Sequence, residues 1–236
     1  MDNTIEMNII DTQPPTDISE AILKAVENDL QSTSDSVSKY KPISAAELLS
    51  WKTEELPKLI DPIFPKTGLV CVAGSSDTGK STFLRQLLLN IVAGEEYFLG
   101  FKIYPTHKRA LYISTEDDSQ AISYLLNVQN RGTQYDPDRI NGLEYIFETE
   151  TLMETISEAL NANPVDVIVL DCLTDLYGGK SSLNESTHVR AFLNPFKELA
   201  DRHKCLIIFL HHTGKRTEDN EPSKRNLLGS QGIEAK

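Results

Sequence analysis

The chain has 236 residues, of which 39% are hydrophobic and 25% are charged, and these proportions are typical of one soluble α/β domain with an additional segment. The formal net charge of −12 argues against a broad electrostatic grip on nucleic acid or on an anionic membrane. No apolar run approaches the roughly 18 residues that a membrane-spanning helix needs, and residues 1–6 lack the basic start of a secretory signal, so we expect a cytoplasmic protein with no membrane partner.

Residues 1–40 form an acidic segment that we expect to be largely flexible and separate from a core of residues 41–236. The segment contains eight acidic residues against two lysines, so it carries half of the net negative charge and leaves room for a basic groove elsewhere. Apolar residues between Ile18 and Leu30 recur on one face of a short helix. That helix belongs either to a solvated tail or to a contact with a neighbouring subunit or partner.

The core begins with a short predicted helix over 44–49. Ser44 is its expected N-cap, and Glu47 three residues later completes a capping box. The following residues, up to Lys66, mix apolar side chains with three prolines. We interpret them as an irregular segment that lies over the edge of the domain.

A phosphate-binding loop follows the first predicted strand, 69–73. Residues 74–81 fit the pattern G-x-x-x-x-G-K-[ST], and apolar residues at helical spacing follow them as far as Gly94. The glycines let the backbone wrap round an anion, Lys80 reaches the β- and γ-phosphates, and Ser81 binds Mg²⁺ through its hydroxyl. We expect the Asp77 carboxylate to turn away from the anion. The predicted nucleotide-binding residues are Gly74, Ser75, Ser76, Asp77, Thr78, Gly79, Lys80, Ser81 and Thr82.

The second predicted strand, 110–114, ends at a group of acidic residues. A connecting loop over 95–106, with aromatic side chains that we expect to serve packing, precedes it. Hydrolysis needs a group that orients the attacking water, and we assign that role to Glu116. We expect Asp117 and Asp118 to cap the helix that follows.

Three further strands are predicted over 143–147, 165–171 and 205–210. The strand over 165–171 is almost wholly apolar and delivers Asp171 to its carboxyl end as the second Mg²⁺ ligand, whereas Asp166 at its start is expected to be solvated. Helices are predicted over 152–163 and 189–199, with a loop over 173–187 between the fourth strand and the second of these helices.

The last predicted strand leads into His211 and His212. Because successive strand residues point to opposite faces, one of them faces the site, and we assign it as His212 near the γ-phosphate. The alternative is a histidine that bonds to backbone at a strand end. The tail 214–236 is either a mobile solvated loop or a DNA-contacting loop whose order depends on nucleotide.

Cys71, Cys172 and Cys205 all lie in or beside predicted strands. An odd number of cysteines at such positions indicates reduced thiols of the core. Their spacing along the chain is wider than that of metal-binding cysteine motifs, so we do not expect a metal site from the sequence.

The alternation of strands and helices predicts an α/β fold with a mostly parallel sheet flanked by helices. Ligands of such sheets bind at the carboxyl ends of the strands. Four candidate functional features of this sequence follow strands at that end: residues 74–81, Glu116, Asp171 and His212. The pattern therefore predicts one site that binds ATP with Mg²⁺ and hydrolyses it.

Several motifs together resemble the RecA-like hexameric ATPases of the RepA replicative helicase type. The resemblance runs from about Ile43 to Lys236. It rests on the following stretches: 44–49, 74–81, Tyr112-Ile113-Ser114-Thr115-Glu116-Asp117, Val167–Asp171 with Leu173, Asn184-Glu185, and His211-His212-Thr213-Gly214-Lys215.

This resemblance implies a RecA-like P-loop core, a hexameric ring with active sites between subunits, and ATP hydrolysis coupled to single-stranded DNA. By position it makes Glu116 and Lys80 catalytic and His212 a phosphate sensor. The family core continues with further strands and a basic residue that reaches the neighbouring subunit's nucleotide, so we expect the C-terminal part of that core to be missing from residues 1–236.

Two other functions remain open from the sequence. One is a small-molecule kinase, although no lid or acceptor pocket is evident. The other is a nucleotide-switched regulatory or assembly ATPase that binds ATP, hydrolyses it slowly and does not unwind DNA.

Overall fold

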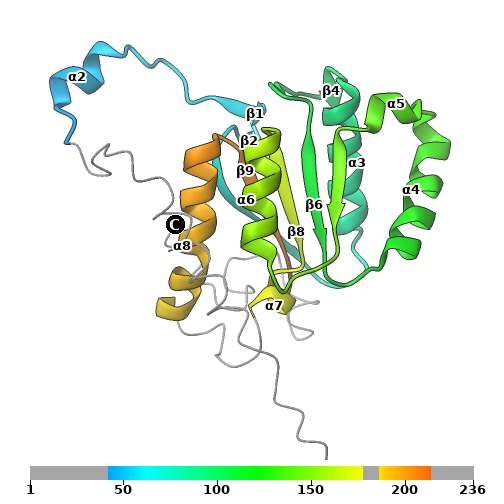
Figure 1. The fold of residues 1–236 in the computed structure, drawn as a ribbon. Coiled ribbons are helices and arrows are strands. Elements are labelled where there is room, and N and C mark those ends of the chain that lie inside the picture. The colour runs from blue at the N-terminus through cyan, green and yellow to red at the C-terminus, as the bar shows by residue number, and fades with distance from the viewer. Residues whose placement is uncertain (1–41, 178–185, 214–236) are drawn as a thin grey trace, which may run out of the picture.

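A five-stranded parallel sheet forms the centre of the domain (Figure 1). The computed structural model describes residues 42–177 and 186–213. The strands lie in the order β3-β9-β8-β6-β7, and each neighbouring pair runs parallel. Their bounds are β3 (Gly68–Gly74), β6 (Ala110–Ser114), β7 (Leu143–Ile146), β8 (Val167–Asp171) and β9 (Leu206–His212). The predicted fold class, an α/β fold with a parallel sheet flanked by helices, is confirmed.

Helices cover both faces of this sheet (Figure 1). Their bounds are α3 (Lys80–Ala93), α4 (Ser119–Thr133), α5 (Pro137–Ile140), α6 (Leu152–Ala162), α7 (Leu173–Leu176) and α8 (Ser186–His203). Strand β8 shows why both faces are needed: Val167 and Val169 pack with α3, whereas Ile168 and Leu170 pack with α6 and α8. Successive strand side chains point to opposite faces, so an all-apolar strand must be buried on both.

Two small hairpins lie where the sequence predicts irregular segments. Strands β1 (Lys58–Ile60) and β2 (Phe64–Pro65) pair antiparallel, as do β4 (Tyr97–Phe98) and β5 (Phe101–Lys102). The hairpins join through backbone hydrogen bonds from Asp61 to Lys102 and from Tyr104 to Leu59, at 3.1 and 2.9 Å. The irregular segment predicted between the short helix and Lys66 and the loop predicted over 95–106 therefore need correction, because long-range pairing organises segments too short to show strand periodicity.

A second correction concerns the loop predicted over 173–187. It begins with the short helix α7, whose Leu173 and Leu176 are buried in the core with α8. Residues 178–185 of this stretch lie outside the described residues.

Helix α2 (Ala45–Ser50) stands apart from the sheet (Figure 1). Its predicted cap is confirmed, because the backbone N–H of Glu47 donates to Ser44 Oγ at 3.1 Å. No residue of α2 is buried, and the apolar side chains of Leu48, Leu49 and Trp51 are exposed. Local sequence thus forms this helix without help from packing against the domain. None of the helices in the ranges 42–177 and 186–213 has the length and apolar character to cross a membrane.

Asp166 anchors the start of β8 and is not solvated as its position predicts. Its side chain is only 2% exposed, and its carboxylate accepts backbone N–H bonds from Thr106, His107 and Lys108 at 2.5, 2.9 and 2.7 Å. The acid therefore fixes the chain entering β6 to the neighbouring strand. Strand periodicity gives no sign of this, because the three donors lie about 60 residues away.

Replacing Asp166 by Ala should lower the free energy of unfolding by about 2–4 kcal/mol, because three backbone donors lose a charged acceptor. Urea denaturation measures the change. Asp136→Ala is the matched control, since Asp136 caps α5 through a single exposed bond to the N–H of Asp138 and should cost at most about 1 kcal/mol. Equal losses in the two variants would show that the Asp166 anchor stabilises the fold no more than an exposed helix cap does.

Candidate active site

The loop between β3 and α3 has the backbone of a phosphate cradle. Gly79 has a φ of +80°, a left-handed conformation that favours glycine, and it immediately precedes α3. A side chain at Gly74 would press on Thr78 Oγ1 at 3.3 Å and on Lys80 Cδ at 3.4 Å. The two motif glycines therefore keep the loop tight at the helix N-terminus, where backbone N–H groups favour an anion.

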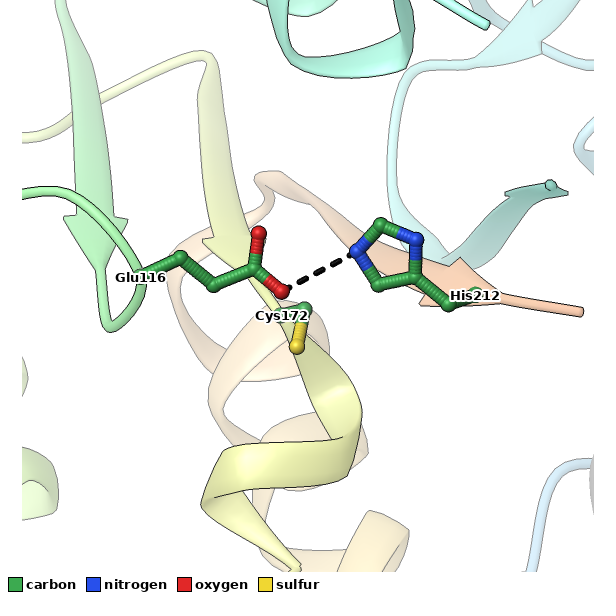
Figure 2. A group of neighbouring side chains, drawn as sticks. All are labelled: Glu116, Cys172 and His212. Atoms are coloured by element: carbon green, nitrogen blue, oxygen red, sulfur yellow. Dashed lines mark hydrogen bonds and ion pairs between the residues drawn. The ribbon is translucent and has the colours of Figure 1, made fainter. Parts of the chain in front are cut away.

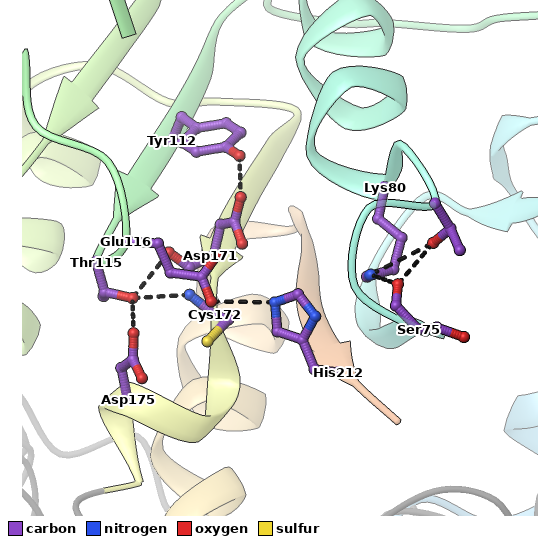
Figure 3. Close-up of polar contacts among 10 residues, drawn as sticks. Ser75, Lys80, Tyr112, Thr115, Glu116, Asp171, Cys172, Asp175 and His212 are labelled. Atoms are coloured by element: carbon purple, nitrogen blue, oxygen red, sulfur yellow. Dashed lines mark hydrogen bonds and ion pairs between the residues drawn. The ribbon is translucent and has the colours of Figure 1, made fainter. Parts of the chain in front are cut away.

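Lys80 bonds within this loop. Its Nζ donates to the backbone oxygen of Ser75 at 2.5 Å and lies 3.5 Å from Thr78 Oγ1 (Figure 3). Thr78 Oγ1 in turn donates to the same Ser75 oxygen at 2.8 Å. The Lys80 ammonium is thus held at the loop by a neutral acceptor. A charged phosphate oxygen can take the place of that acceptor and form a stronger bond.

A cavity of about 570 Å³ opens beside the loop and is lined by residues from three separate strand ends. The lining residues are Ser76, Asp77, Gly79, Lys80, Ser81, Thr82, Glu116 and His212. Of the predicted site residues in the described ranges, Gly74, Ser75, Thr78 and Asp171 do not line it. Asp77 is exposed and contributes to the wall, so the prediction that its carboxylate turns away stays a prediction.

Glu116 and His212 meet across the sheet (Figure 3). His212 Nε2 lies 3.0 Å from Glu116 Oε1, although 96 residues separate the two in sequence. Both side chains are accessible from the cavity, with 43% and 29% of their surfaces exposed. His212 therefore bonds to a carboxylate, which differs from the backbone contact considered as the alternative. Neighbouring His211 is fully buried, so the two histidines do face different surroundings.

Asp171 lies deeper, at the end of β8. Its side chain is 4% exposed and accepts a short hydrogen bond from the Tyr112 hydroxyl through Oδ2 (Figure 3). Oδ1 is also buried, and no described residue bonds to it. A buried carboxylate oxygen without a partner costs free energy unless a cation or water satisfies it, so this atom fits a magnesium site.

Thr115 connects the strand ends that carry Glu116 and Asp171, a role that the sequence pattern does not reveal. Its Oγ1 accepts the backbone N–H of Cys172 at 2.8 Å. The single proton of that hydroxyl faces the backbone oxygen of Asp171 at 2.9 Å and Asp175 Oδ2 at 2.8 Å. The only available signal was that Thr115 immediately precedes the predicted catalytic acid.

Arg85 supports the loop helix from behind and was also missed. The side chain is 3% exposed, and its guanidinium donates to Gln129 Oε1 at 3.0 Å and to Thr82 Oγ1 at 3.4 Å. Gln129 donates in turn to the Thr82 backbone oxygen at 3.0 Å. These bonds tie α4 to the first turn of α3. A lone arginine among the leucines of a helix gives no sequence signal for such a contact.

Two aromatic hydroxyls, the Cys172 thiol beside the site and the Cys205 thiol at the opposite end of β9 stay neutral. Burial and the adjacent Asp171 raise the pKa of Tyr112, and burial raises that of Tyr145. Burial raises the pKa of Cys172 to about 12 and that of Cys205 to about 12. The three cysteines are free, and Cys172 and Cys205 are buried, as predicted for core thiols. The raised pKa values keep these hydroxyls and thiols uncharged at ordinary pH.

Comparison with known families assigns the chain to one of them. Residues 34–218 match the sequence model of a family described as AAA domain. The chain belongs to this family. The AAA domain family is a P-loop NTPase family that includes RepA- and DnaB-like proteins of the RecA fold, which supports the resemblance drawn from the sequence motifs. No curated protein matches the chain.

Membership of the AAA domain family implies nucleoside triphosphate binding and hydrolysis, and such P-loop ATPases generally bind ATP with Mg²⁺. Three parts of the sequence-based prediction fall outside the described residues of this AAA domain: the segment 1–40, the Asn184-Glu185 pair and the tail 214–236. The flexible segment, the short helix within it and the DNA-contacting loop therefore stay predictions.

Proposed function

We propose that this AAA domain binds ATP in the cavity beside residues 74–82 and hydrolyses it by in-line attack of water on the γ-phosphate. One observation carries the proposal: Lys80, Ser81, Glu116 and His212 come from three strand ends and border the same cavity. A chance glycine turn would not bring a lysine, a hydroxyl and an acid to one space at the carboxyl edge of a parallel sheet.

Each residue has a distinct task. Lys80 exchanges its bond to Ser75 for the β- and γ-phosphates, and the loop N–H groups hold the remaining phosphate oxygens. Ser81 and Asp171 would hold Mg²⁺, which when bound neutralises charge on the phosphates. Glu116 aligns the attacking water and accepts its proton.

The contact between His212 and Glu116 gives the site an order of events. An arriving γ-phosphate competes with Glu116 for His212 Nε2, because the ring nitrogen and the carboxylate border the same cavity. Departure of His212 frees Glu116 Oε1 to accept a hydrogen bond from water. His212 thus senses the phosphate. Because His212 is the last residue of β9, a change in its hydrogen bond on phosphate binding also affects the residues that follow the strand.

We further propose that the domain works in a ring as a DNA-dependent motor. The RepA-like motifs support this, and the exposed apolar face of α2, which has no buried residue, supports contact with a second copy. A nucleotide-switched regulatory ATPase is the alternative, and the net charge of −12 favours it because DNA binding draws on positive surface.

Measuring ATP hydrolysis by the full chain with and without single-stranded DNA, together with its mass in solution, separates these functions. A motor should hydrolyse ATP faster by about tenfold or more with DNA, in a salt-dependent manner, and should assemble into a species of several chains. Nucleotide hydrolysis that DNA leaves unchanged would support the switch. A protein that does not hydrolyse ATP under either condition would contradict the enzymatic proposal altogether.

A further inference from the structure

Three side chains of different chemistry meet at the edge of the cavity. Figure 2 shows Glu116, which follows β6, Cys172, which follows β8, and His212 at the end of β9. One ligand atom from each, a carboxylate oxygen, a sulfur and a ring nitrogen, lies within 4.8 Å of the other two. In the described part of the chain, no other three His, Cys, Asp or Glu side chains gather in this way.

We propose that Glu116, Cys172 and His212 form a binding site for a thiophilic divalent cation such as Zn²⁺, and that its occupation stops ATP hydrolysis. A thiolate, an imidazole and a carboxylate are the ligands that zinc uses in proteins. The ligands assigned to Mg²⁺, from Ser81 and Asp171, are oxygens alone, which suit a hard cation. The two ligand sets therefore select different ions at neighbouring positions.

The geometry is close to what zinc needs. Bonds of about 2.0–2.3 Å in a tetrahedron separate neighbouring ligand atoms by roughly 3.3–3.8 Å. The oxygen of Glu116 and the nitrogen of His212 are already 3.0 Å apart. Because both lie within 4.8 Å of the Cys172 sulfur, each needs to move by no more than about 1–2 Å to reach zinc-ligand spacing.

The ligands differ in their freedom to make that movement. Cys172 is buried, and its backbone N–H is held by Thr115 at 2.8 Å, so its sulfur is the fixed point. Glu116 and His212 are partly exposed side chains and can turn toward it. The ion displaces the thiol proton to solvent and binds Nε2 of a neutral imidazole, and water takes the fourth position.

The inhibitory part of this inference rests on the proposed function. An ion bound to Glu116 engages the carboxylate that aligns water, and an ion bound to His212 engages the nitrogen that responds to the γ-phosphate. Zinc and productive ATP binding thus require the same two side chains. Binding of the ion itself does not depend on the enzymatic role.

Cobalt titration of the full-length, nucleotide-free protein tests the site directly. Co²⁺ takes zinc sites, and a cobalt–thiolate bond absorbs in the near-ultraviolet. We expect the wild-type protein to develop this absorption, to lose it when Zn²⁺ is added, and to keep it when Mg²⁺ is added. Cys172→Ser should abolish the absorption and weaken cobalt binding at least about a hundredfold, because a hydroxyl replaces a thiolate.

Cys71→Ser is the matched control. Cys71 is a half-buried thiol of β3 outside the three-residue group, so its loss should leave the absorption unchanged. His212→Ala is the second variant, and it should weaken cobalt binding without removing the thiolate. A wild-type protein without the near-ultraviolet absorption would overturn the metal site, whatever the variants do.

Hydrolysis in zinc-buffered solution tests the inhibition. Zinc should inhibit the wild-type protein reversibly, with activity restored by a chelator, and Cys172→Ser should need at least about a hundredfold more free zinc for the same fractional loss of its own rate. Cobalt–thiolate absorption combined with zinc-insensitive hydrolysis would overturn the inhibitory role. Absorption in a protein that does not hydrolyse ATP would leave the metal site standing and contradict the proposed function.

Discussion

Replacing Lys80 by Ala should abolish ATP turnover and weaken ATP binding by about a hundredfold or more. The Lys80 ammonium is held at the phosphate loop by a neutral acceptor, the Ser75 backbone oxygen at 2.5 Å. Transfer of that donor to a phosphate forms a charge-assisted bond of roughly 3 kcal/mol, which corresponds to about a hundredfold in affinity. Binding of a fluorescent ATP analogue and release of phosphate measure the two effects.

Lys58→Ala is the control for charge. Lys58 lies on β1 and pairs with Asp61 at 2.7 Å, away from the residues that line the cavity. Both substitutions remove one positive charge, so only a local role of Lys80 separates them. Turnover that survives Lys80→Ala at the wild-type rate would mean that the nucleotide does not bind at residues 74–82.

Glu116→Gln should preserve ATP binding and lower hydrolysis by about 10²- to 10⁴-fold. The amide has the shape of the carboxylate and can still contact His212, but it cannot accept a proton from water. The protein should therefore retain ATP, and single-turnover measurements should show a slow chemical step with an unaltered binding step.

Asp117→Asn provides the matched control one residue away. The contact described for Asp117 is through its backbone, which accepts a bond from the Ser114 hydroxyl at 2.8 Å, so the loss of its side-chain charge should leave hydrolysis near the wild-type rate. If Glu116→Gln hydrolyses ATP as fast as wild type, another group handles the water. If both variants lose activity equally, the effect belongs to the local charge and not to Glu116.

The strands of the sheet could be predicted from sequence because their burial requires apolar residues within each strand itself. The stretch from Val167 to Leu170 is apolar throughout, as a strand covered on both faces must be, and the described strand differs from the prediction only at its start. The loop at 74–81 was equally predictable, because its glycines and lysine must occupy fixed positions relative to the helix that follows.

The hairpins and the Asp166 anchor could not be predicted in the same way. Strands of two or three residues have no periodicity to detect, and a bridge between Ile60 and Ile103 joins their two hairpins across more than 40 residues of sequence. Asp166 looks like an ordinary polar residue before a strand until three distant N–H groups converge on it. Long-range hydrogen bonds of this kind leave no mark on either local sequence.

The sequence by itself determined the alternating α/β elements, the phosphate loop and the fact that Glu116, Asp171 and His212 follow strands. Only the tertiary structure decided which of these side chains meet. The strand order places β9 between β3 and β8, so His212 reaches Glu116 and nears Cys172, whereas Asp171 turns to Tyr112. The physical reason is that hydrophobic packing on both faces selects the order of the strands, and that order is a property of the whole core.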